Sequence, residues 1–460
     1  MWSLAASAAA VGGQLTGPDA PYLGVVTDTR GDCRGQLFVA LRGARFDGHD
    51  YVMQAAAQGA AAAMVERPVA VDLPQWVLPD TRLALGRLAA AWRQRIPARV
   101  VAITGSNGKT TVKEMVAAIL SQCGPTRATA GNLNNDIGMP LTLLAARDEA
   151  YLILEMGANH AGEIGYLTDL ARPAAALITN AGRAHLEGFG SLEGVARAKG
   201  EIARGLPADG TFVFMADCPW TPLWQSLAAG RPTLTFGAGP SAQVRAEAAS
   251  ITTTWDADGF ATRFQADLAG QPVALSLGLA GAHNVHNALA ASALVTALGV
   301  APATIQAGLA SLRPVPRRLQ PRLGSDGRRL IDDTYNANPD SLAAAVAVLV
   351  GLPGRPVLVL GDFAELGPDS ATLHREMGAA ARAAGVAALY AVGPLAAAAV
   401  DGFGPGARHC PDQAALIATV AADTGPDAVI LVKGSRSAAM ERVADALCHG
   451  WAVAGQGQGT

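Results

Sequence analysis

Residues 99–120 read RVVAITGSNGKTTVKEMVAAIL, and this stretch decides the fold of the middle of the chain. Its first residues, Arg99–Ile103, are an apolar run that predicts a buried strand. Further along, apolar side chains recur every three or four residues, which predicts a helix with one buried face. The residues of that face are Val112, Met115, Val116, Ile119 and Leu120. A strand followed by a helix predicts an α/β fold with a parallel sheet.

The turn between this strand and helix, TGSNGKTT at 104–111, has the character of a phosphate-binding loop. Small residues let main-chain N–H groups surround an anion, and the helix N-terminus adds partial positive charge. Lys109 is placed to reach the outer phosphates of a nucleotide, and the Thr110 hydroxyl to bind Mg²⁺. The standard motif has glycine where this chain has Ile103, so a chance glycine turn stays an alternative. The residues expected at the nucleotide are Gly105, Ser106, Asn107, Gly108, Lys109, Thr110 and Thr111.

The composition bounds the protein class. The chain has 460 residues, a formal net charge of -3 and 50% hydrophobic residues, with only 16% charged. A single core stops growing at roughly 250–300 residues, so we expect two or three domains. The slight acidity excludes a dedicated nucleic-acid binder, and no apolar stretch reaches the ~20 residues of a membrane span. The five cysteines lack close spacing, so we expect reduced, buried thiols in a cytoplasmic protein.

Two proline-containing seams, Trp92–Arg99 and Ser311–Arg318, divide the chain. Apolar strands alternate with helical segments in all three pieces, and the N-terminus before Gly12 is expected to form a helix. Residues 232–277 alternate with period two between glycines, which predicts antiparallel hairpins. The expected strands are Gln36–Leu41, Ala62–Glu66, Gln75–Leu78, Tyr151–Leu154, Ala175–Ile178, Val357–Leu360, Ala388–Val392 and Ala428–Val432.

Three residues outside the loop are candidates for chemistry. Glu155 ends the strand Tyr151–Leu154, where a carboxylate can hold Mg²⁺ near the phosphates, although it can equally be an ordinary strand-end glutamate. His185 and Lys199 remain ambiguous from the residues alone, because a lone histidine or lysine is usually structural or solvated.

Several motifs occur together in order, and together they resemble the Mur ligases, ATP-dependent amide-bond ligases of peptidoglycan precursors. They are TGSNGKTT, GNLNNDIGMP (131–140), EMGANHAGEIG (155–165), NAGRAHLEGFGSLEGVARAKGEI (180–202), GAHNVHNALAA (281–291), DDTYNANPDSL (332–342), LGDFAELG (360–367) and VKGSR (432–436). The resemblance implies three domains: a UDP-substrate domain at 1–95, a central phosphate-loop ATPase-like parallel sheet at 96–313 and a Rossmann-like domain at 314–460.

The resemblance also implies site roles. Lys199 matches a family lysine that is carbamylated and so holds a second Mg²⁺, with Thr110, Glu155 and His185 as the other metal ligands. Lys109, Lys199, His185 and Arg318 are the implied catalytic residues. Asn284 and Asn287 match positions near adenine, although Asn284 can also be a helix cap. Asp333 matches a ribose-binding aspartate. Arg318 matches a phosphate-facing arginine, and Arg317 replaces the family glycine beside it.

Substrate contacts are implied for three further groups. The uridine diphosphate is expected at Thr27, Asp28, Thr29, Arg30, Arg42, Asp47 and His49. The muramoyl group is expected at Asn134 and Asn135. The incoming dipeptide is expected at Tyr335, Asn336, Asn338, Lys433, Ser435 and Arg436.

Within the family, DDTYNANPDSL with EMGANHAGEIG resembles members that add D-alanyl-D-alanine to UDP-N-acetylmuramoyl-tripeptide through an acyl phosphate. The D-N-P-R signature of diaminopimelate-adding members is absent from the sequence. A cytoplasmic monomer without nucleic-acid or membrane partners is implied. Two alternatives stay open: a folylpolyglutamate synthetase on the same scaffold, and a nucleotide-binding module or mechanical ATPase without ligase chemistry.

Overall fold

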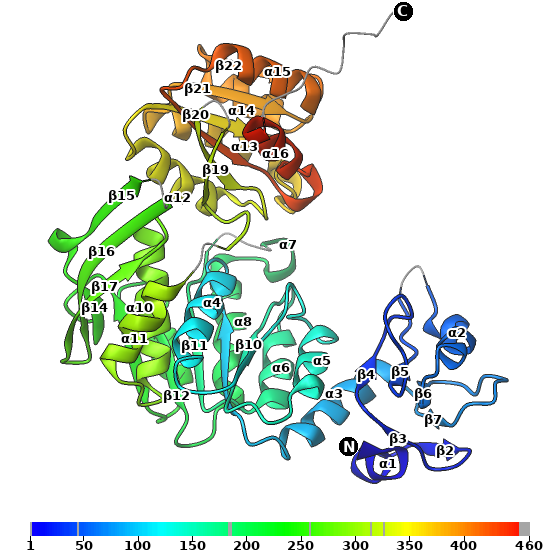
Figure 1. Ribbon diagram of the computed structural model, residues 1–460. Coiled ribbons are helices and arrows are strands. Elements are labelled where there is room, and N and C mark those ends of the chain that lie inside the picture. The colour runs from blue at the N-terminus through cyan, green and yellow to red at the C-terminus, as the bar shows by residue number, and fades with distance from the viewer. Residues whose placement is uncertain are drawn as a thin grey trace, which may run out of the picture.

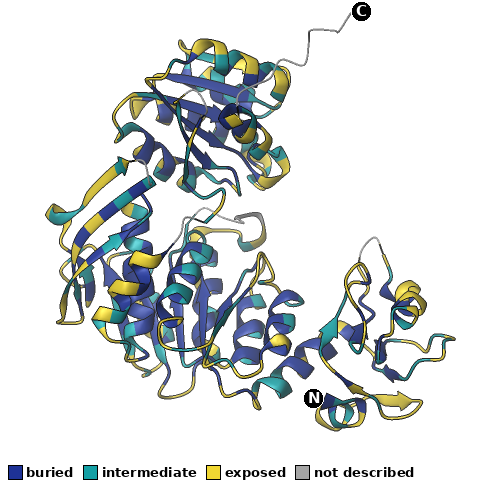
Figure 2. Cartoon of the chain, viewed as in Figure 1, coloured by how far each residue is buried: buried dark blue, intermediate teal, exposed yellow. Residues whose placement is uncertain are grey.

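The computed structural model describes residues 2–43, 46–182, 186–256, 259–312, 315–324 and 327–449. Three sheet-containing bodies follow one another along the chain, and the C-terminal body lies against the central one while the N-terminal body lies at the other end (Figure 1). In all three bodies the inner strands are buried, and the exposed residues lie on the outer faces of the helices and on several of the outermost strands (Figure 2). None of the helices within these ranges combines the length and apolar character that a bilayer crossing requires.

The N-terminal sheet has five strands in the order β2-β7-β6-β5-β4, and only the β2–β7 pair is antiparallel. These strands are β2 (Gln14–Thr16), β4 (Val25–Val26), β5 (Leu37–Val39), β6 (Ala62–Val65) and β7 (Gln75–Val77). A separate antiparallel pair joins β1 (Trp2–Ser3) to β3 (Pro21–Tyr22). The expected first helix forms as α1 (Leu4–Val11), because the Ser3 hydroxyl accepts the N–H of Ala6 and Gly12 ends the helix with φ of 94°. The remaining helical segments are η1 (Gly48–Tyr51) and α2 (Val52–Ala57).

Helix α3 (Thr81–Arg93) connects this sheet to the rest of the protein. The Asp80 carboxylate caps it by accepting the N–H of Leu83 at 2.8 Å. The helix packs against α1 on one side and against α5 (Gly138–Ala145) and α6 (Glu163–Ala171) on the other. One buried apolar cluster therefore runs from the N-terminal sheet through α3 into the central body, and the first turn of α3 is fixed beside the central sheet.

The central sheet follows the order β15-β16-β14-β13-β12-β11-β8-β10-β9, with β17 paired to β16. Its strands are β8 (Arg99–Thr104), β9 (Thr126–Ala128), β10 (Tyr151–Glu155), β11 (Ala175–Ile178), β12 (Thr211–Met215), β13 (Thr233–Gly237), β14 (Val244–Ala246), β15 (Thr252–Asp256), β16 (Gly259–Leu268) and β17 (Pro272–Leu277). Strand β8 lies between β10 and β11, and both pairings are parallel. The carboxyl ends of these three strands therefore meet at one edge of the sheet.

Helices cover both faces of this sheet. Val100 and Ala102 of β8 belong to one buried cluster, whereas Val101 and Ile103 belong to the other. The helices are α4 (Lys109–Leu120), α10 (Ala282–Thr296) and α11 (Pro302–Ser311) on one face, and α5, α6, α8 (Leu192–Gly200) and α9 (Thr221–Leu227) on the other. All five apolar residues predicted for the inner face of α4 are buried.

The antiparallel prediction for residues 232–277 is right for β15, β16 and β17, and β14 pairs antiparallel with β16, but the prediction is wrong for β13. Strand β13 pairs in parallel with β12 and with β14. Its alternating burial misled the reading, because a parallel strand covered on only one face alternates like an antiparallel one. Of the cysteines, Cys33, Cys410 and Cys448 are buried thiols as expected, whereas Cys123 is exposed and Cys218 is partly exposed.

The C-terminal sheet has the order β18-β19-β23-β20-β21-β22, and only β18 is antiparallel to its neighbour. Its strands are β18 (Gln320–Leu323), β19 (Arg329–Asp333), β20 (Arg355–Leu360), β21 (Ala388–Val392), β22 (Ala407–Cys410) and β23 (Ala428–Lys433). Helices α12 (Pro339–Val350), α13 (Ser370–Ala383) and α14 (Ala396–Phe403) cover one face, and α15 (Gln413–Asp423) and α16 (Glu441–His449) the other.

The β15–β16 hairpin joins the central and C-terminal bodies. Phe260 is buried within the apolar cluster of the C-terminal sheet. The Trp255 ring packs 4.7 Å from the Phe260 ring, and the Arg329 guanidinium lies 5.6 Å from the Trp255 ring. This apolar contact fixes the C-terminal body beside the carboxyl ends of the central strands.

Candidate active site

A cavity of about 1350 Å³ lies between the central and C-terminal bodies. Its walls include the phosphate-loop segment, Glu155 at the end of β10, Asn284 and Asn287 of α10, and the C-terminal segments around 318, 335 and 436. The first turn of α3 adds Arg82 to the lining. This volume exceeds that of ordinary small-molecule pockets, so the cavity can hold a nucleotide together with a second substrate.

Two glycines of the phosphate loop are required by close packing. Gly105 has φ of 147°, and a Cβ there would collide with the Thr179 hydroxyl. Gly108 has φ of 81°, and a Cβ there would collide with the Asn287 side-chain oxygen. The loop therefore takes its shape from backbone conformations that only glycine adopts without strain.

The segment after β11 holds the phosphate loop in place. The Asn107 N–H donates to the Asn180 side-chain oxygen at 2.9 Å, and the Thr179 hydroxyl donates to the Asn107 carbonyl at 2.6 Å. The Ser106 N–H donates to the Asn180 carbonyl at 3.1 Å. The sequence reading gave neither Thr179 nor Asn180 a role; their position directly after a buried parallel strand is the signal that was available.

Lys109 folds back onto the loop that precedes it. Its ammonium donates to the Gly105 carbonyl at 2.6 Å and to the Ser106 carbonyl at 3.3 Å. Burial lowers the pKa of Lys109 below its ordinary value; Glu155 opposes this shift and Arg318 adds to it. The Lys109 ammonium is thus bonded to uncharged main-chain carbonyls, and the phosphates of a bound nucleotide would supply the negative charge that it lacks there.

Arg318 reaches the phosphate loop from the C-terminal body. Its guanidinium donates to the Thr110 hydroxyl at 3.1 Å, and its Nε is buried without a partner among the described residues. The Tyr335 ring lies 4.3 Å from this guanidinium and 5.2 Å from that of Arg436. Two arginines are therefore held on one aromatic ring beside the helix N-terminus, which makes this corner of the cavity an anion site.

Arg317 adopts the left-handed conformation that glycine favours, with φ of 63°. Its carbonyl accepts the N–H of Tyr335 at 3.1 Å, and its N–H donates to the Gln320 side chain at 3.1 Å. The turn that a family glycine would form is therefore retained with arginine, at a conformational cost of about 1–2 kcal/mol. Leu319 on the other side of Arg318 is also left-handed, with φ of 45°.

Glu155 is buried, with 3% of its surface exposed. The Asn134 amide donates to its Oε1 at 2.8 Å, whereas its Oε2 has no partner among the described residues. An orphaned carboxylate oxygen beside the Thr110 loop fits Mg²⁺, which takes few protein oxygens and keeps several waters. In the part of the chain that the structure describes, no three His, Cys, Asp or Glu side chains gather as a metal cluster. His185 lies outside the described residues.

Lys199, near the end of α8, is 2% exposed, and its ammonium lies 5.2 Å from the Phe189 ring. Burial, together with the charge of Lys109, lowers its pKa to about 7, while Glu163 and Glu201 oppose the shift. A large fraction of this amine is therefore neutral near pH 7, which a lysine in water would not be.

The two asparagines of α10 are linked to each other. The Asn287 amide donates to the Asn284 side-chain oxygen at 3.1 Å, and the Asn284 amide donates to the Ala280 carbonyl at 2.8 Å. Gly281 occupies the cap position of this helix, and no side chain caps it. The capping alternative for Asn284 is therefore wrong.

Two residues predicted for different ligands form one ion pair. The Lys433 ammonium donates to Asp333 Oδ2 at 2.5 Å and to the Asn336 carbonyl at 3.2 Å, and Lys433 is 1% exposed. The other oxygen of Asp333 accepts the N–H of Leu319 at 3.1 Å. Asp333 thus neutralises Lys433 and fixes the turn that carries Arg318.

Other predicted residues have structural partners as well. The Asn135 side chain accepts the N–H of Gly138 at 2.8 Å, at the start of α5. The Ser435 hydroxyl accepts the N–H of Ala364 at 2.7 Å. The side-chain oxygen of Asn336 accepts the N–H of Ala337 at 2.9 Å. Asn134, Asn135, Asn336, Ser435 and Arg436 all line the cavity, and their contacts to substrates stay predictions.

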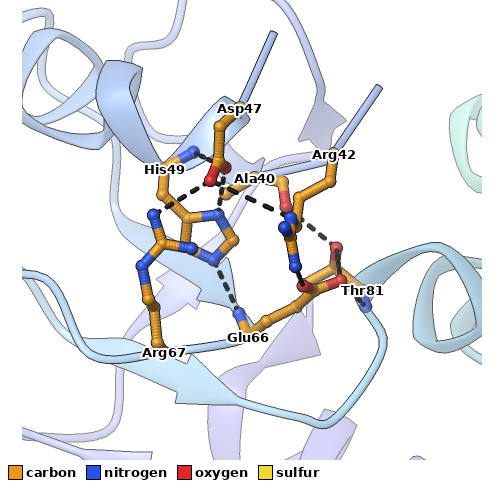
Figure 3. Close-up of polar contacts among 7 residues, drawn as sticks. All are labelled: Ala40, Arg42, Asp47, His49, Glu66, Arg67 and Thr81. Carbon is orange, nitrogen blue, oxygen red and sulfur yellow. Dashed lines mark hydrogen bonds and ion pairs between the residues drawn. The ribbon is translucent and has the colours of Figure 1, made fainter. Parts of the chain in front are cut away.

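The N-terminal motif residues do not line this cavity. Figure 3 shows a polar network around Asp47. The Asp47 carboxylate lies 2.6 Å from Nδ1 of His49 and accepts a hydrogen bond from Arg67 at 2.9 Å. The other ring nitrogen, Nε2 of His49, accepts the Glu66 N–H at 2.9 Å. The N–H and ring of His49, with Arg67, hold the pKa of Asp47 well below its ordinary value. Both ring nitrogens of His49 therefore have partners within the N-terminal body.

The other N-terminal motif is an exposed turn. Arg30 and Asp28 form an ion pair at 2.6 Å, which lowers the pKa of Asp28 to about 2. Thr29 is buried and its carbonyl accepts the Gln58 amide at 2.9 Å, whereas Thr27 is half-buried. Arg42 lies 3.6 Å from Glu66. Whether these residues bind a uridine nucleotide stays a prediction.

The sequence reading also missed cavity residues on α3 and α6. Arg82 pairs with Asp136, in the loop that carries Asn134 and Asn135. Glu163 accepts the N–H of Asn159 at 2.7 Å. His283 lines the same cavity, and burial lowers its pKa to about 4. The quoted motif blocks contain Asp136, Glu163 and His283, but none of these three residues was given a role.

The chain matches three family models in succession. These are the Mur ligase family catalytic domain at residues 21–105, the Mur ligase middle domain at 103–295 and the Mur ligase glutamate ligase domain at 317–436. Together with the relatives described next, these matches show that the chain belongs to the Mur ligase family.

Individual relatives and solved structures are similar to this chain over nearly its full length. The UDP-N-acetylmuramoyl-tripeptide--D-alanyl-D-alanine ligase of Escherichia coli (strain K12) is 50% identical over 438 residues, which cover 95% of this chain and 96% of that protein. A crystal structure of MurF from Acinetobacter baumannii matches with a TM-score of 0.89 at 37% identity, covering 96% of this chain and 97% of that chain. The MurF ligase of Thermotoga maritima in complex with ADP matches with a TM-score of 0.81 at 29% identity, covering 92% and 96%.

Proposed function

We propose that this protein uses ATP to join D-alanyl-D-alanine to the terminal carboxylate of UDP-N-acetylmuramoyl-tripeptide, a step of peptidoglycan precursor synthesis. The names of its relatives support the substrates, and the ADP complex of the Thermotoga maritima relative supports the nucleotide. The observation that carries the chemistry is the Arg318–Thr110 contact, which brings a C-terminal arginine onto the phosphate loop. These relatives favour neither a folylpolyglutamate synthetase nor a mechanical ATPase.

The reaction requires activation of a carboxylate. A carboxylate oxygen attacks the γ-phosphorus of ATP, the bond to ADP breaks, and an acyl phosphate forms. The dipeptide amine then attacks the acyl carbon, phosphate leaves, and the amine loses a proton. Both partners of the first step are anions, so positioning and charge neutralisation carry most of the rate. Lys109 and Arg318 would supply that neutralisation.

Glu155 Oε2 and the Thr110 hydroxyl would hold Mg²⁺, which offsets the charge of the transferring phosphoryl group when bound. Arg318 contacts Thr110 through one of its donors, and its unpartnered Nε would be free to bind a phosphate oxygen. His185 is proposed as a further ligand from the family resemblance. Asn284, Asn287 and Asp333 are proposed for the adenosine, and Tyr335, Asn338 and Arg436 for the dipeptide.

Lys199 is proposed to be carbamylated and to hold a second Mg²⁺. Its neutral amine would attack CO₂, forming a C–N bond and a carboxylate while one proton is released. The lowered pKa of Lys199 supports this step, because only the neutral amine is a nucleophile. Burial would then protect the carbamate from water.

The N-terminal residues around Asp28 and Asp47 are proposed to bind the uridine diphosphate. The three sheets support domain bounds near residues 95 and 313, although Arg313 and Pro314 lie outside the described residues. A cytoplasmic monomer is proposed as well, since the reaction draws on the ATP pool; sedimentation velocity tests the monomer.

A substrate-omission assay tests this function. We expect ADP and phosphate release only when UDP-N-acetylmuramoyl-tripeptide, D-alanyl-D-alanine and Mg²⁺ are all present. Equal turnover with a single amino acid in place of the dipeptide contradicts the proposed substrate. ATP turnover without either acceptor or dipeptide instead indicates an ATPase.

A further inference from the structure

Helix α4 carries a second lysine, Lys113, that the proposed chemistry does not use. Lys113 lies one turn after Lys109 and is 2% exposed. Burying an ammonium carries a large free-energy cost unless its donors are bonded. An apolar residue of similar length would avoid that cost on this buried helix face, so the contacts of the ammonium matter.

The ammonium of Lys113 has two partners. It donates to the Thr129 carbonyl at 2.7 Å, and it pairs with Glu114 Oε1 at 2.8 Å. The Glu114 side chain is 39% exposed, so that ion pair is partly solvated and contributes little. Thr129 is 1% exposed and directly follows β9. Water can replace Glu114 as a partner of the Lys113 ammonium, but it cannot reach the buried contact with the Thr129 carbonyl.

Thr129 in turn holds the backbone of Glu155. The regular pairing of β9 with β10 ends at Ala128 and Ile153. Beyond it, the Thr129 N–H donates to the Ile153 carbonyl at 2.9 Å, and the Thr129 hydroxyl accepts the Glu155 N–H at 3.0 Å. The Thr129 side chain thus extends the hydrogen bonding between β9 and β10 by one residue, and the residue that it fixes is Glu155.

The same threonine precedes the loop that contacts the carboxylate itself. Asn134 lies five residues after Thr129, and its amide donates to Glu155 Oε1 at 2.8 Å. Glu155 is therefore held by its backbone through Thr129 and by its side chain through Asn134. Its one remaining oxygen, Oε2, is buried and unpartnered among the described residues. Thr129, whose carbonyl Lys113 binds, and Asn134 lie on the same segment after β9.

We propose that Lys113 is a positioning residue for the Glu155 carboxylate, acting through Thr129, and that it sets the affinity of the Mg²⁺ site. The proposal rests on the metal role of Glu155 given under the proposed function. Groups that orient a metal ligand typically change metal affinity by about 10–100-fold when removed. A residue that serves only the stability of the fold would leave metal affinity unchanged.

The test measures ADP binding by calorimetry in EDTA and over a series of Mg²⁺ concentrations. Lys113→Met keeps the length of the side chain and removes the ammonium. We expect its ADP affinity in EDTA to match the parent protein within about twofold, and its half-saturating Mg²⁺ concentration to rise about tenfold. Glu114→Ala is the matched control, since it removes the exposed partner of the same ammonium; it is expected to keep the parent Mg²⁺ dependence.

A second variant covers the case in which Lys113→Met does not fold. Thr129→Val keeps the carbonyl that Lys113 contacts and removes only the hydroxyl that accepts the Glu155 N–H. The same rise in the required Mg²⁺ concentration is expected. An unchanged Mg²⁺ dependence in a folded Lys113→Met or Thr129→Val protein overturns the proposal.

Glu155→Gln separates this inference from the function on which it rests. If Mg²⁺ dependence persists in Glu155→Gln, the metal role of Glu155 is wrong and the inference fails with it. If Glu155→Gln loses the Mg²⁺ dependence of ADP binding while Lys113→Met keeps the parent Mg²⁺ dependence, only the proposed role of Lys113 is wrong.

Discussion

The Asn338 amide donates a hydrogen bond of 2.7 Å to the side-chain oxygen of Asn107, which lies 231 residues earlier in the chain. Asn107 belongs to the phosphate loop, and Asn338 stands at the N-terminus of α12. The Asn338 oxygen caps that helix by accepting the Ser341 N–H at 2.8 Å. One side chain thus starts a C-terminal helix and fastens it to the nucleotide-binding loop of the central body.

Asn338→Ser separates these two tasks. Serine caps a helix nearly as well as asparagine but is too short to reach Asn107. Losing one hydrogen bond of ~1 kcal/mol lowers the melting temperature only slightly because the helix keeps its cap, and we expect the less well fixed phosphate loop to weaken ADP affinity by up to about fivefold. Calorimetric ADP titration and thermal melting measure both. A fall in melting temperature with unchanged ADP affinity contradicts a role in the site.

Arg317 tests the cost of a left-handed residue beside Arg318. Arg317→Gly removes the strain of the folded protein, but glycine also raises the conformational entropy of the unfolded chain. Because the two effects oppose each other, we expect the free energy of unfolding to change by no more than about 1 kcal/mol. Arg317→Val places a β-branched residue at φ of 63°, and we expect a loss of about 2 kcal/mol. Scanning calorimetry compares the two variants; equal stability would show that the turn relaxes to another conformation.

His283 gives a pH dependence with a definite sign. Its pKa is about 4 in the folded protein, chiefly through burial, against 6.5 ordinarily. Below pH 6.5 the unfolded chain therefore binds a proton that the folded protein does not. The stability is therefore full above pH 6.5 and falls as the pH drops toward 4; at pH 5 the loss amounts to about 2 kcal/mol.

Melting temperatures at pH 7.5 and pH 5 check this. The parent protein is expected to lose more stability between these values than His283→Gln, which cannot titrate. Equal losses in the two proteins would mean that His283 is protonated without cost in the folded state.

Lys199→Ala is expected to lose activity and to regain part of it with added short carboxylic acids, because these can replace the carbamate oxygens at the metal. The phosphate-release assay measures both values. No rescue, together with a mass spectrum of unmodified Lys199 in CO₂-saturated buffer, counts against carbamylation.

The sequence predicted those parts of the fold that follow from local periodicity. The inner face of α4, the strand β8 and the glycines of the phosphate loop each depend on residues close together in the chain. The alternation in β13 misled the reading because it reports which faces are covered, and a half-covered parallel strand gives the same pattern as a hairpin strand.

The side-chain pairings at the site were beyond the sequence. Lys433 and Asp333 were assigned to different ligands, yet they pair across neighbouring strands β23 and β19. Asn134 was expected at the muramoyl group, and its contact with Glu155 was not predicted. Such pairings depend on strand order and loop course, and residue type at a position does not encode either. Family resemblance supplied candidates for the site without their partners.

The central claim is that the acceptor carboxylate is activated by the γ-phosphate of ATP. The most direct measurement uses UDP-N-acetylmuramoyl-tripeptide labelled with ¹⁸O in its terminal carboxylate and follows the label by mass spectrometry after one turnover with D-alanyl-D-alanine. We predict ADP as the nucleotide product and one ¹⁸O in the released phosphate. Label in AMP, or unlabelled phosphate with amide formed, would contradict it.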